Sequence, residues 1–502
     1  MTGPLLTAAR RTRELDELTG TTVDVLVIGG GVTGCGTALD AAARGLSVAL
    51  VEKSDLAHGT SRWSSKLVHG GLRYLATGDV ALALESARER GTLLTTIAPH
   101  LVRPLPMVVA LGDDVGRRDG LLVDAGHRTA DLLRRAAGTA RTTLPAPRRI
   151  SAVETVRLIP GVRRRGLRGG LLNWDGQLED DARLVVALAR TAASYGARIV
   201  TYATAVQADG GGATVRDEQT GETVRLRARY VVNATGAWAD QLSPDTRLRP
   251  SKGTHVVLSA ASLGHPAASL TVPVPGERNR YVFALPHADG LVHVGLTDDA
   301  LDGPLPDVPR AEESEISFLF DTLSRGLETP LSRADVVGSY AGVRPLLDGA
   351  DGRTADLSRR HAVVRGGNGV WTVLGGKLTT YRRMAQDVVD RLTDVPCRTA
   401  SLPLVGATGP ARPAPGRLVR RYGTEAADVA ALADRDPGLL EPVAAGVPVL
   451  GVELLWGVLA EGALHAADLL ERRTRLSLVD AWHEAARPAA DRAIAVGAGR
   501  TG

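Results

Sequence analysis

The stretch Val25-Leu-Val-Ile-Gly-Gly-Gly-Val-Thr-Gly34 decides the fold class of this 502-residue chain. Its apolar half predicts a strand buried in a parallel sheet, because both faces of such a strand meet other apolar groups. The alanine-rich segment 35–44 predicts a helix directly after the glycines, and Gly45 can end that helix as a C-terminal cap. A second apolar run occupies 46–51. Together these segments predict a strand–helix–strand unit of the α/β class.

Three glycines in this stretch have the spacing of a dinucleotide-binding turn. Gly29 permits the tight turn, Gly31 lets the backbone approach a pyrophosphate, and Gly34 lets helix and strand pack closely. The helix N-terminus then offers free N–H groups to the phosphates. Glu52, at the end of the second strand, can accept hydrogen bonds from ribose hydroxyls, and its charge disfavours a 2′-phosphate. The motif predicts a bound dinucleotide and leaves NAD and FAD open.

Composition excludes several classes of protein. Hydrophobic residues make up 44% and charged residues 23%, with 57 glycines, which suits a globular α/β chain with many tight turns. Cys35 and Cys397 belong to no Cys/His cluster, so neither a disulfide framework nor a metal site is expected. A net charge of +4 gives no reason to expect a nucleic-acid partner. Without a secretory signal or a run of about 18 apolar residues, a cytoplasmic protein is expected.

The stretch 128–168 departs from this balance. It holds eleven arginines against only Asp131 and Glu154. A solvated surface is the favoured interpretation of such a run. The alternative is a patch that meets anionic lipid headgroups at the inner face of the cell membrane, and that alternative stays open. The oligomeric state cannot be predicted from the sequence.

Further along the chain, helices are expected at 80–98 and 180–195, and a strand at 100–111. From there to about residue 175 no clear period is found. Short apolar runs separated by turns between 253 and 298 predict an antiparallel sheet of the kind that covers a substrate. The predicted domains are a discontinuous cofactor-binding domain (20–110, 180–250 and 335–400), a substrate or cap domain (111–179 and 251–334) and a C-terminal helical domain (416–490).

Several strings resemble those of FAD-dependent glycerol-3-phosphate dehydrogenases, of the D-amino-acid-oxidase-like flavoprotein superfamily. They are Thr60–Leu75 (TSRWSSKLVHGGLRYL), Ala341–Leu346 (AGVRPL), Gly375–Tyr381 (GGKLTTY), Asp180–Leu184 (DDARL) and Val232–Trp238 (VNATGAW). The resemblance implies a Rossmann-like FAD-binding domain, an antiparallel-sheet substrate domain and a C-terminal helical bundle. It also implies noncovalent FAD and hydride transfer from C2 of glycerol 3-phosphate to flavin N5, giving dihydroxyacetone phosphate.

The resemblance also implies residues that hold and activate the substrate. Arg344 and Arg73 are expected to bind the phosphate with help from Lys377, because a guanidinium fork matches phosphate oxygens. Tyr74 and Thr297 are expected on the substrate side. His69 leads as the base for the C2 hydroxyl, since imidazole titrates near neutral pH, and Lys377 is the competing base.

The same family resemblance implies a set of cofactor contacts. The amide-rich start of the helix after Gly376 is expected to stabilise the reduced flavin, with Thr379 as a contact. The remaining expected contacts are Ser61, Ser64, Ser65, Lys66, His69 and Gly236.

Two departures from the family pattern bear on the partners. Leu296 replaces the first threonine of the family's G-T-T-D segment, and residues 112–150 lack the apolar and aromatic stretch by which membrane-associated members insert. The electron acceptor therefore stays open between a quinone, oxygen and another carrier. Two other functions are also considered: a flavin oxidase of the same fold that acts on an amine or amino acid, and a non-catalytic dinucleotide-binding redox module.

Overall fold

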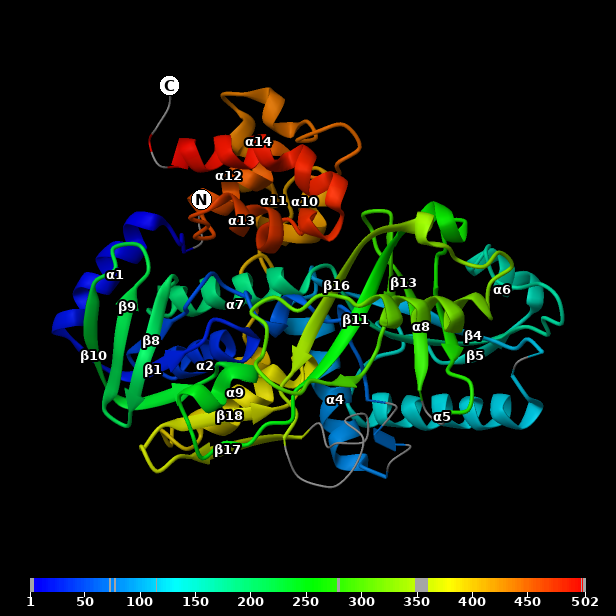
Figure 1. The fold of residues 1–502 in the computed structure, drawn as a ribbon, viewed down its shortest axis with the longest axis horizontal. Helices are drawn as coiled ribbons and strands as arrows, with labels where there is room; N and C mark the ends of the chain where they lie inside the picture. Colours follow the sequence, from blue (N-terminus) through cyan, green and yellow to red (C-terminus); the bar gives the residue numbers. More distant parts are fainter. Residues whose placement is uncertain are drawn as a thin grey trace.

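The computed structural model describes residues 4–71, 74–75, 78–113, 115–277, 280–347, 360–497 and 499. Within those ranges the strands form an eight-stranded sheet and a ten-stranded sheet. In Figure 1 the C-terminal helices gather above helix α7 (Asp181–Ser194), which lies between them and the first sheet. Among the described residues, no helix is both long and apolar enough to cross a membrane.

The predicted strand–helix–strand unit forms the centre of the eight-stranded sheet. Strand β1 (Thr22–Ile28) pairs in parallel with β2 (Val48–Val51) on one side and with β10 (Thr223–Asn233) on the other. The sheet order is β17-β18-β10-β1-β2-β7, where the further strands are β7 (Arg198–Val200), β17 (His361–Arg365) and β18 (Trp371–Gly375). Strands β8 (Ala203–Asp209) and β9 (Gly212–Asp217) extend β10 as an antiparallel excursion.

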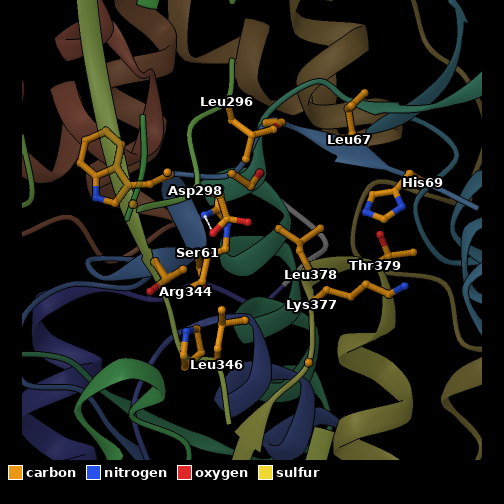
Figure 2. Close-up of a pocket in the computed structure, with 18 of the residues that line it drawn as sticks. Ser61, Leu67, His69, Leu296, Asp298, Arg344, Leu346, Lys377, Leu378 and Thr379 are labelled. Carbon is orange, nitrogen blue, oxygen red and sulfur yellow. Dashed lines mark hydrogen bonds and ion pairs between the residues drawn. The ribbon is translucent and has the colours of Figure 1, made fainter. Parts of the chain in front are cut away.

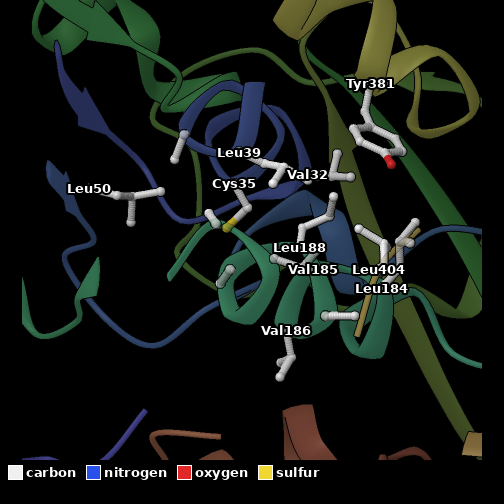
Figure 3. Close-up of a cluster of buried hydrophobic side chains, with 14 of the residues drawn as sticks. Val32, Cys35, Leu39, Leu50, Leu184, Val185, Val186, Leu188, Tyr381 and Leu404 are labelled. Carbon is white, nitrogen blue, oxygen red and sulfur yellow. The ribbon is translucent and has the colours of Figure 1, made fainter. Parts of the chain in front are cut away.

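A buried apolar cluster holds the helices against this sheet. Helix α2 (Val32–Ala43) packs on both α7 and α9 (Tyr381–Val389). Figure 3 shows side chains of all three helices meeting there, including Leu39, Leu188 and Tyr381. Helix α2 begins at Val32 rather than at Cys35 because Gly31 already occupies the N-cap position. The start of this helix is therefore brought to the end of β1, where the glycine motif requires it.

The ten-stranded sheet is the expected substrate-side sheet, and it is largely antiparallel. Its order is β15-β11-β14-β13-β12-β4-β6-β3, with β16 paired to β11 and β5 paired to β6. Its strands are β3 (Leu67–Val68), β4 (Val102–Ala110), β5 (Arg148–Ile150), β6 (Gly170–Leu178), β11 (Ser251–Ser259), β12 (Ser269–Pro273), β13 (Tyr281–Pro286), β14 (Leu291–Gly295), β15 (Asp299–Ala300) and β16 (Val336–Arg344). One pairing is parallel, between β12 and β4. Strands β3, β4 and β16 lie in this sheet although their sequence ranges were assigned to the cofactor-binding domain.

Two helices form where the sequence showed no clear period. Helix α5 (Arg117–Ala136) and helix α6 (Ala152–Leu158) lie within or beside the arginine-rich stretch. Helix α5 runs along one side of the molecule, near α4 (Val80–Thr92) (Figure 1). Helix α8 (Glu313–Ser324) packs on the ten-stranded sheet at β11 and β13. The expected helix at 80–98 is confirmed by α4 and the π-helical turn Leu93–Ile97 that continues it.

The C-terminal region consists of short helical segments and one long helix. The segments are α10 (Gly416–Tyr422), α11 (Ala426–Ala430), α12 (Gly451–Leu459), α13 (Ala466–Asp468), the π-helical turn Leu469–Arg473 and α14 (Asp480–Gly497). Buried ion pairs fasten this region to α7: Arg190 donates to both carboxylate oxygens of Glu425 at 2.7 and 2.8 Å. Arg183 pairs in the same way with Glu461.

Candidate active site

A cavity of about 2290 Å³ lies where the two sheets meet. The eight-stranded sheet contributes the end of β1 and the turn at Gly375, and the ten-stranded sheet contributes Gly253 and Arg344. Helix α5 closes part of the wall with residues such as Leu122. Figure 2 shows the side chains that point into this space. The cavity therefore joins the predicted dinucleotide site to the predicted substrate side.

The glycine motif has the geometry that its spacing predicts. Gly29 has a φ of +112°, and a Cβ there would stand 2.7 Å from the carbonyl oxygen of Ala234. A Cβ on Gly34 would lie only 1.9 Å from the carbonyl oxygen of Gly29, so only glycine lets α2 approach β1. Gly29 and Gly31 line the cavity, whereas Gly34 acts through packing alone.

Glu52 lies at the predicted position, at the end of β2 and on the cavity wall. Its carboxylate accepts hydrogen bonds from the backbone N–H of Gly30 at 2.6 Å and of Ser54 at 2.9 Å. Burial raises the pKa of Glu52, and these two hydrogen bonds oppose that shift. The glycine loop and the acidic residue therefore hold each other in place.

The serines of the Thr60–Leu75 string line the cavity, but the lysine that follows them does not. Ser61 accepts a hydrogen bond from the backbone N–H of Val32 at 2.9 Å, at the first turn of α2. Ser64 and Ser65 also lie on the wall. Lys66 is absent from the wall, since its Nζ bonds to Asp181 Oδ2 at 3.2 Å inside the protein. The cofactor contact expected of Lys66 stays a prediction, and the structure shows its side chain held by Asp181 rather than on the cavity wall.

The turn after β18 brings the second group of predicted residues to the cavity. Gly375 and Gly376 have φ values of +69° and +77°, and a Cβ on Gly376 would meet the Met384 sulfur at 2.4 Å. Gly376 and Thr379 line the cavity, and so does Gly236 at the end of β10. The expected helix start is confirmed in a modified form: a 3-10 turn, Leu378–Thr380, precedes α9.

His69 and Lys377 both line the cavity and lie on the same side of it in the view of Figure 2. The ring of Tyr74 links them: its centroid lies 6.4 Å from that of His69 and 4.1 Å from Lys377 Nζ. Lys377 Nζ also donates a hydrogen bond to Ser86 Oγ of α4. This part of the cavity holds both of the residues that the sequence proposed as a base.

Arg344 stands on the opposite side of the cavity in the view of Figure 2, paired with Asp298. Its Nη1 lies 3.1 Å from Asp298 Oδ1, and its Nη2 donates to the carbonyl oxygen of Thr297 at 3.0 Å. The Thr297 side chain is turned away from the cavity and binds the backbone N–H of Thr254 and the carboxylate of Glu315. Thr297 is absent from the cavity wall, whereas its neighbour Asp298 lines it.

Three cationic residues, Arg344, Lys377 and Arg73, are expected around the substrate, and the structure places two of them on the cavity wall. Arg344 and Lys377 both line the cavity, but the cationic ends of their side chains engage different partners. Arg73 lies outside the described residues. Among the side chains that are described, no group of three or more histidines, cysteines or carboxylates is placed to hold a metal ion.

Sequence reasoning missed His255, a buried histidine of β11 that lines the cavity. Its Nε2 lies 2.8 Å from Ser65 Oγ, and its ring stacks on Tyr340 with centroids 4.7 Å apart. Burial, together with the charges of Lys66 and Arg344, lowers the pKa of His255 well below its usual value. No signal in the local sequence distinguished this histidine from one buried for packing alone.

The chain is similar to known proteins over nearly its whole length. Residues 24–382 match the family described as FAD dependent oxidoreductase, and residues 397–501 match the C-terminal domain of alpha-glycerophosphate oxidase. Glycerol-3-phosphate dehydrogenase 1 of Mycobacterium tuberculosis (strain ATCC 25618 / H37Rv) is 53% identical over 492 residues, covering 94% of this chain and 95% of that protein.

Solved structures are similar as well. The glycerol-3-phosphate dehydrogenase from Bacillus halodurans complexed with FAD superposes with a TM-score of 0.75 at 25% identity, covering 99% of this chain and 94% of that one. The L-alpha-glycerophosphate oxidase from Mycoplasma pneumoniae with FAD bound gives 0.56 at 20% identity, covering 76% of this chain and 99% of that one. The second comparison shows a shared fold.

Proposed function

The chain belongs to the FAD-dependent glycerol-3-phosphate dehydrogenases, and from that premise we propose how its own residues carry out the reaction. The protein is an FAD-dependent enzyme that oxidises sn-glycerol 3-phosphate to dihydroxyacetone phosphate and passes the electrons to an acceptor. The residue assignments rest on one observation: Gly29, His69, Arg344 and Lys377 all line the same cavity. When bound, FAD supplies the acceptor for the hydride that leaves C2 of the substrate.

The residues present fit this cofactor. The cradle around Gly29 and Gly31 has no room for a Cβ at the first position, and it faces the start of α2, whose N–H groups favour phosphate. Glu52 is held at the cavity wall for a ribose. We expect the other end of the cofactor to lie against Gly376 and Thr379, where the φ of +77° at Gly376 turns the backbone. Ser61, Ser64 and Ser65 complete the proposed contacts.

Arg344 is the proposed phosphate-binding residue. Asp298, Ser251 and the Thr297 carbonyl hold its guanidinium in one orientation, with the closest of these contacts between 3.0 and 3.1 Å. Because the guanidinium is already fixed, it loses little further conformational entropy when it binds a phosphate. Its planar fork also matches two phosphate oxygens at once. Lys377 and Arg73 are proposed as further cationic contacts, and Tyr74 as part of the wall beside them.

His69 is the proposed base for the C2 hydroxyl. It lines the cavity on the same side as Lys377, and an imidazole accepts a proton near neutral pH. Lys377 Nζ lies 4.1 Å from the centre of the Tyr74 ring and donates to Ser86, which favours its charged form and therefore a role as a cation. We accordingly assign proton removal to His69 and charge stabilisation to Lys377.

The chain is proposed to divide into three parts. The eight-stranded sheet and its helices form the cofactor-binding part, and the ten-stranded sheet forms the substrate part. Assigning β3, β4 and β16 to the substrate part follows the hydrogen bonding of the sheets rather than the linear ranges. The helical region 416–490 is proposed as the third part.

A membrane quinone is the proposed electron acceptor. Helix α5 exposes Leu121, Leu122 and Leu132 by 58%, 71% and 61%, and Leu122 also lines the cavity. The arginines of the stretch 128–168 are almost all exposed, since of the eleven only Arg134 is buried. Exposed leucines beside arginines suit the headgroup region of an anionic bilayer. We therefore propose that α5 rests on the inner face of the cell membrane, next to one wall of the cavity.

Anaerobic addition of substrate tests the assignment of the cavity. The purified protein should show a flavin absorption spectrum that bleaches with sn-glycerol 3-phosphate and stays unchanged with glycerol or with amino acids. Bleaching by an amino acid would support an oxidase of the same fold instead. A flavin spectrum that no substrate bleaches would support a non-catalytic redox module.

A further inference from the structure

Asp181, the first residue of α7, holds the cavity wall at Ser64 from inside the protein. Its Oδ2 accepts hydrogen bonds from the Ser64 backbone N–H at 3.0 Å, from Ser64 Oγ at 2.7 Å and from Lys66 Nζ at 3.2 Å. The carboxylate is completely buried. A buried carboxylate stays charged only where cations and N–H groups compensate for the lost water. The position of the wall therefore depends on the charges around Asp181.

The second cation at Asp181 comes from the C-terminal region. Arg475 donates from Nη1 to Asp181 Oδ1, and its guanidinium lies 3.6 Å from Asp180. The side chain of Arg475 is 6% exposed. Burial alone would raise the pKa of Asp181, but the charges of Lys66 and Arg475 lower it to about 2. Lys66 and Arg475, more than 400 residues apart in the sequence, thus share one buried ionic contact with Asp181.

Arg475 occupies this place at a cost in free energy. Its φ is +64° and that of Lys66 is +54°, the left-handed region that non-glycine residues rarely adopt. Two of its nitrogens, Nε and Nη2, are buried with no hydrogen-bond partner among the described residues. Strained backbone and unsatisfied buried donors persist where function requires them more often than elsewhere. The strained backbone occurs at both cations that contact Asp181, and the unsatisfied donors belong to Arg475.

Arg475 also contacts the wall directly. Its guanidinium lies 5.7 Å from the centre of the Trp63 ring, and Trp63 lines the cavity beside Ser64. Tyr340 stacks on Trp63 and donates a hydrogen bond to the carbonyl oxygen of Ser64 at 3.1 Å. Ser65 then contacts His255. The three wall residues 63–65 are thereby fixed between Arg475 and the strands that carry His255 and Arg344.

We propose that Arg475 is a positioning residue for the active site, which acts through Asp181 to fix residues 63–65 and so couples the C-terminal region to FAD binding and substrate oxidation. The proposal rests on the proposed assignment of the cavity to FAD and glycerol 3-phosphate. It gives the C-terminal region a direct part in the chemistry of the site, beyond covering α7. Arg475 touches neither substrate nor cofactor in this scheme.

Arg475→Met tests the proposal, with Arg190→Met as a matched control. Both variants break a buried contact between the C-terminal region and α7. Arg475 and Asp181 contact the wall residues Trp63 and Ser64, whereas Arg190 contacts Glu425, the Pro4 carbonyl oxygen and the Trp456 ring. Both should therefore lower the melting temperature. Only Arg475→Met should raise the Kd for FAD and lower kcat at saturating FAD, each by at least about tenfold, because breaking a buried pair strands the remaining charge. Arg475→Lys should recover part of both losses.

The double variant Arg475→Met/Asp181→Asn separates positioning from general damage. If Arg475 acts through Asp181, the double variant should lose no more FAD affinity than the worse single variant, rather than the product of both losses. Equal Kd and kcat in Arg475→Met and Arg190→Met would overturn the proposal. Should Arg475→Met fail to fold, an unchanged Kd for FAD in Asp181→Asn would overturn it as well. A wild-type protein that binds FAD without oxidising glycerol 3-phosphate would refute the proposed chemistry, while the Kd comparison would still test Arg475.

Discussion

Arg344 and Asp298 form an ion pair on the cavity wall, with Nη1 and Oδ1 3.1 Å apart. Ser251 donates to the same carboxylate oxygen and accepts from the same guanidinium nitrogen, so the three side chains form a closed hydrogen-bonded group. A Cβ on Gly253 would stand 2.0 Å from Arg344 Nη2, which shows how closely the backbone of β11 passes this guanidinium. The orientation of Arg344 is therefore set by its neighbours before any ligand enters.

We predict that Arg344→Lys raises the KM for glycerol 3-phosphate at least about tenfold and changes kcat less, because an ammonium cannot reproduce the planar fork. Steady-state kinetics with a dye acceptor would measure both constants, and the flavin should remain bound. Arg325→Lys is the control, since Arg325 also lines the cavity but has no proposed role. An unchanged KM in Arg344→Lys would remove Arg344 from the phosphate site.

Gly34→Ala should prevent FAD binding and lower the melting temperature. The new Cβ would lie 1.9 Å from the carbonyl oxygen of Gly29, so α2 must move away from β1 and carry its N-terminus with it. Gly20→Ala is the control, because a Cβ there would meet nothing within 4 Å. We expect that control to change stability by less than about 1 kcal/mol. Flavin released on filtration and thermal unfolding would be measured for both, and retention of FAD by Gly34→Ala would contradict the packing argument.

The nucleotide-binding half could be predicted because its determinants are local. Spacing in Gly29–Gly34 and the apolar runs on either side fix the turn, the helix and the neighbouring strands, with no information from distant residues. The pairing of β12 with β4 in parallel could not be predicted, since it joins segments more than a hundred residues apart in the sequence. The pairing of β16 with β11 likewise joins segments that are distant in the sequence.

Side-chain direction was harder to predict than position. The family string identified the neighbourhood of Lys66 and Thr297, but whether a side chain faces the cavity depends on the buried partner that it meets. Asp181 draws Lys66 inward, and Thr254 and Glu315 draw Thr297 away from the cavity. Helix α5 was missed because its leucines lie on an exposed face, while the residues that it buries are Gly120, His127, Asp131 and Arg134 rather than the apolar stripe that marks a helix packed on a core.

The stability of the protein should fall on acidification through the buried histidines near His255. His287 and His293 stack with ring centroids 4.1 Å apart, and burial with the charge of Lys66 lowers the pKa of His287 to about 3. Unfolded chains take up the proton near pH ~6.5. The unfolded state therefore binds more protons below that pH, and the stability present above it is progressively lost as the pH falls towards about 3.

His287→Gln should weaken this dependence, because the unfolded state then has one proton fewer to gain. Melting temperatures at about pH 7.5 and pH 5 would be compared between the variant and the wild type. The drop between the two pH values should be smaller in the variant. Equal drops in both proteins would show that His287 does not contribute.

Leu121→Glu and Leu132→Glu should weaken binding to anionic vesicles. The two side chains are exposed by 58% and 61% and project from the same face of α5, since they are eleven residues apart. A carboxylate there opposes both insertion and the attraction of the neighbouring arginines to anionic lipid. Cosedimentation with vesicles of phosphatidylglycerol, compared with phosphatidylcholine alone, would measure the effect.

Val419→Glu is the control for this measurement, because Val419 is similarly exposed, at 43%, but lies on α10 in the C-terminal region. The control should bind vesicles as the wild type does. If neither leucine substitution reduced cosedimentation, α5 would not be the membrane-contacting surface. A wild-type protein that ignores anionic vesicles would refute the peripheral contact itself.

His69→Gln should slow flavin reduction by about a hundredfold or more, the usual contribution of a positioned base, while leaving the Kd for glycerol 3-phosphate nearly unchanged. Stopped-flow absorbance under anaerobic conditions separates these two quantities, because the rate at saturating substrate reports the chemical step. His255→Gln is the matched comparison: His255 also lines the cavity, but its Nε2 already contacts Ser65 at 2.8 Å and burial keeps its pKa low. Its loss should slow reduction less than the loss of His69. The reverse order would transfer the role of base to His255, and equal wild-type rates in both variants would leave Lys377 as the candidate base.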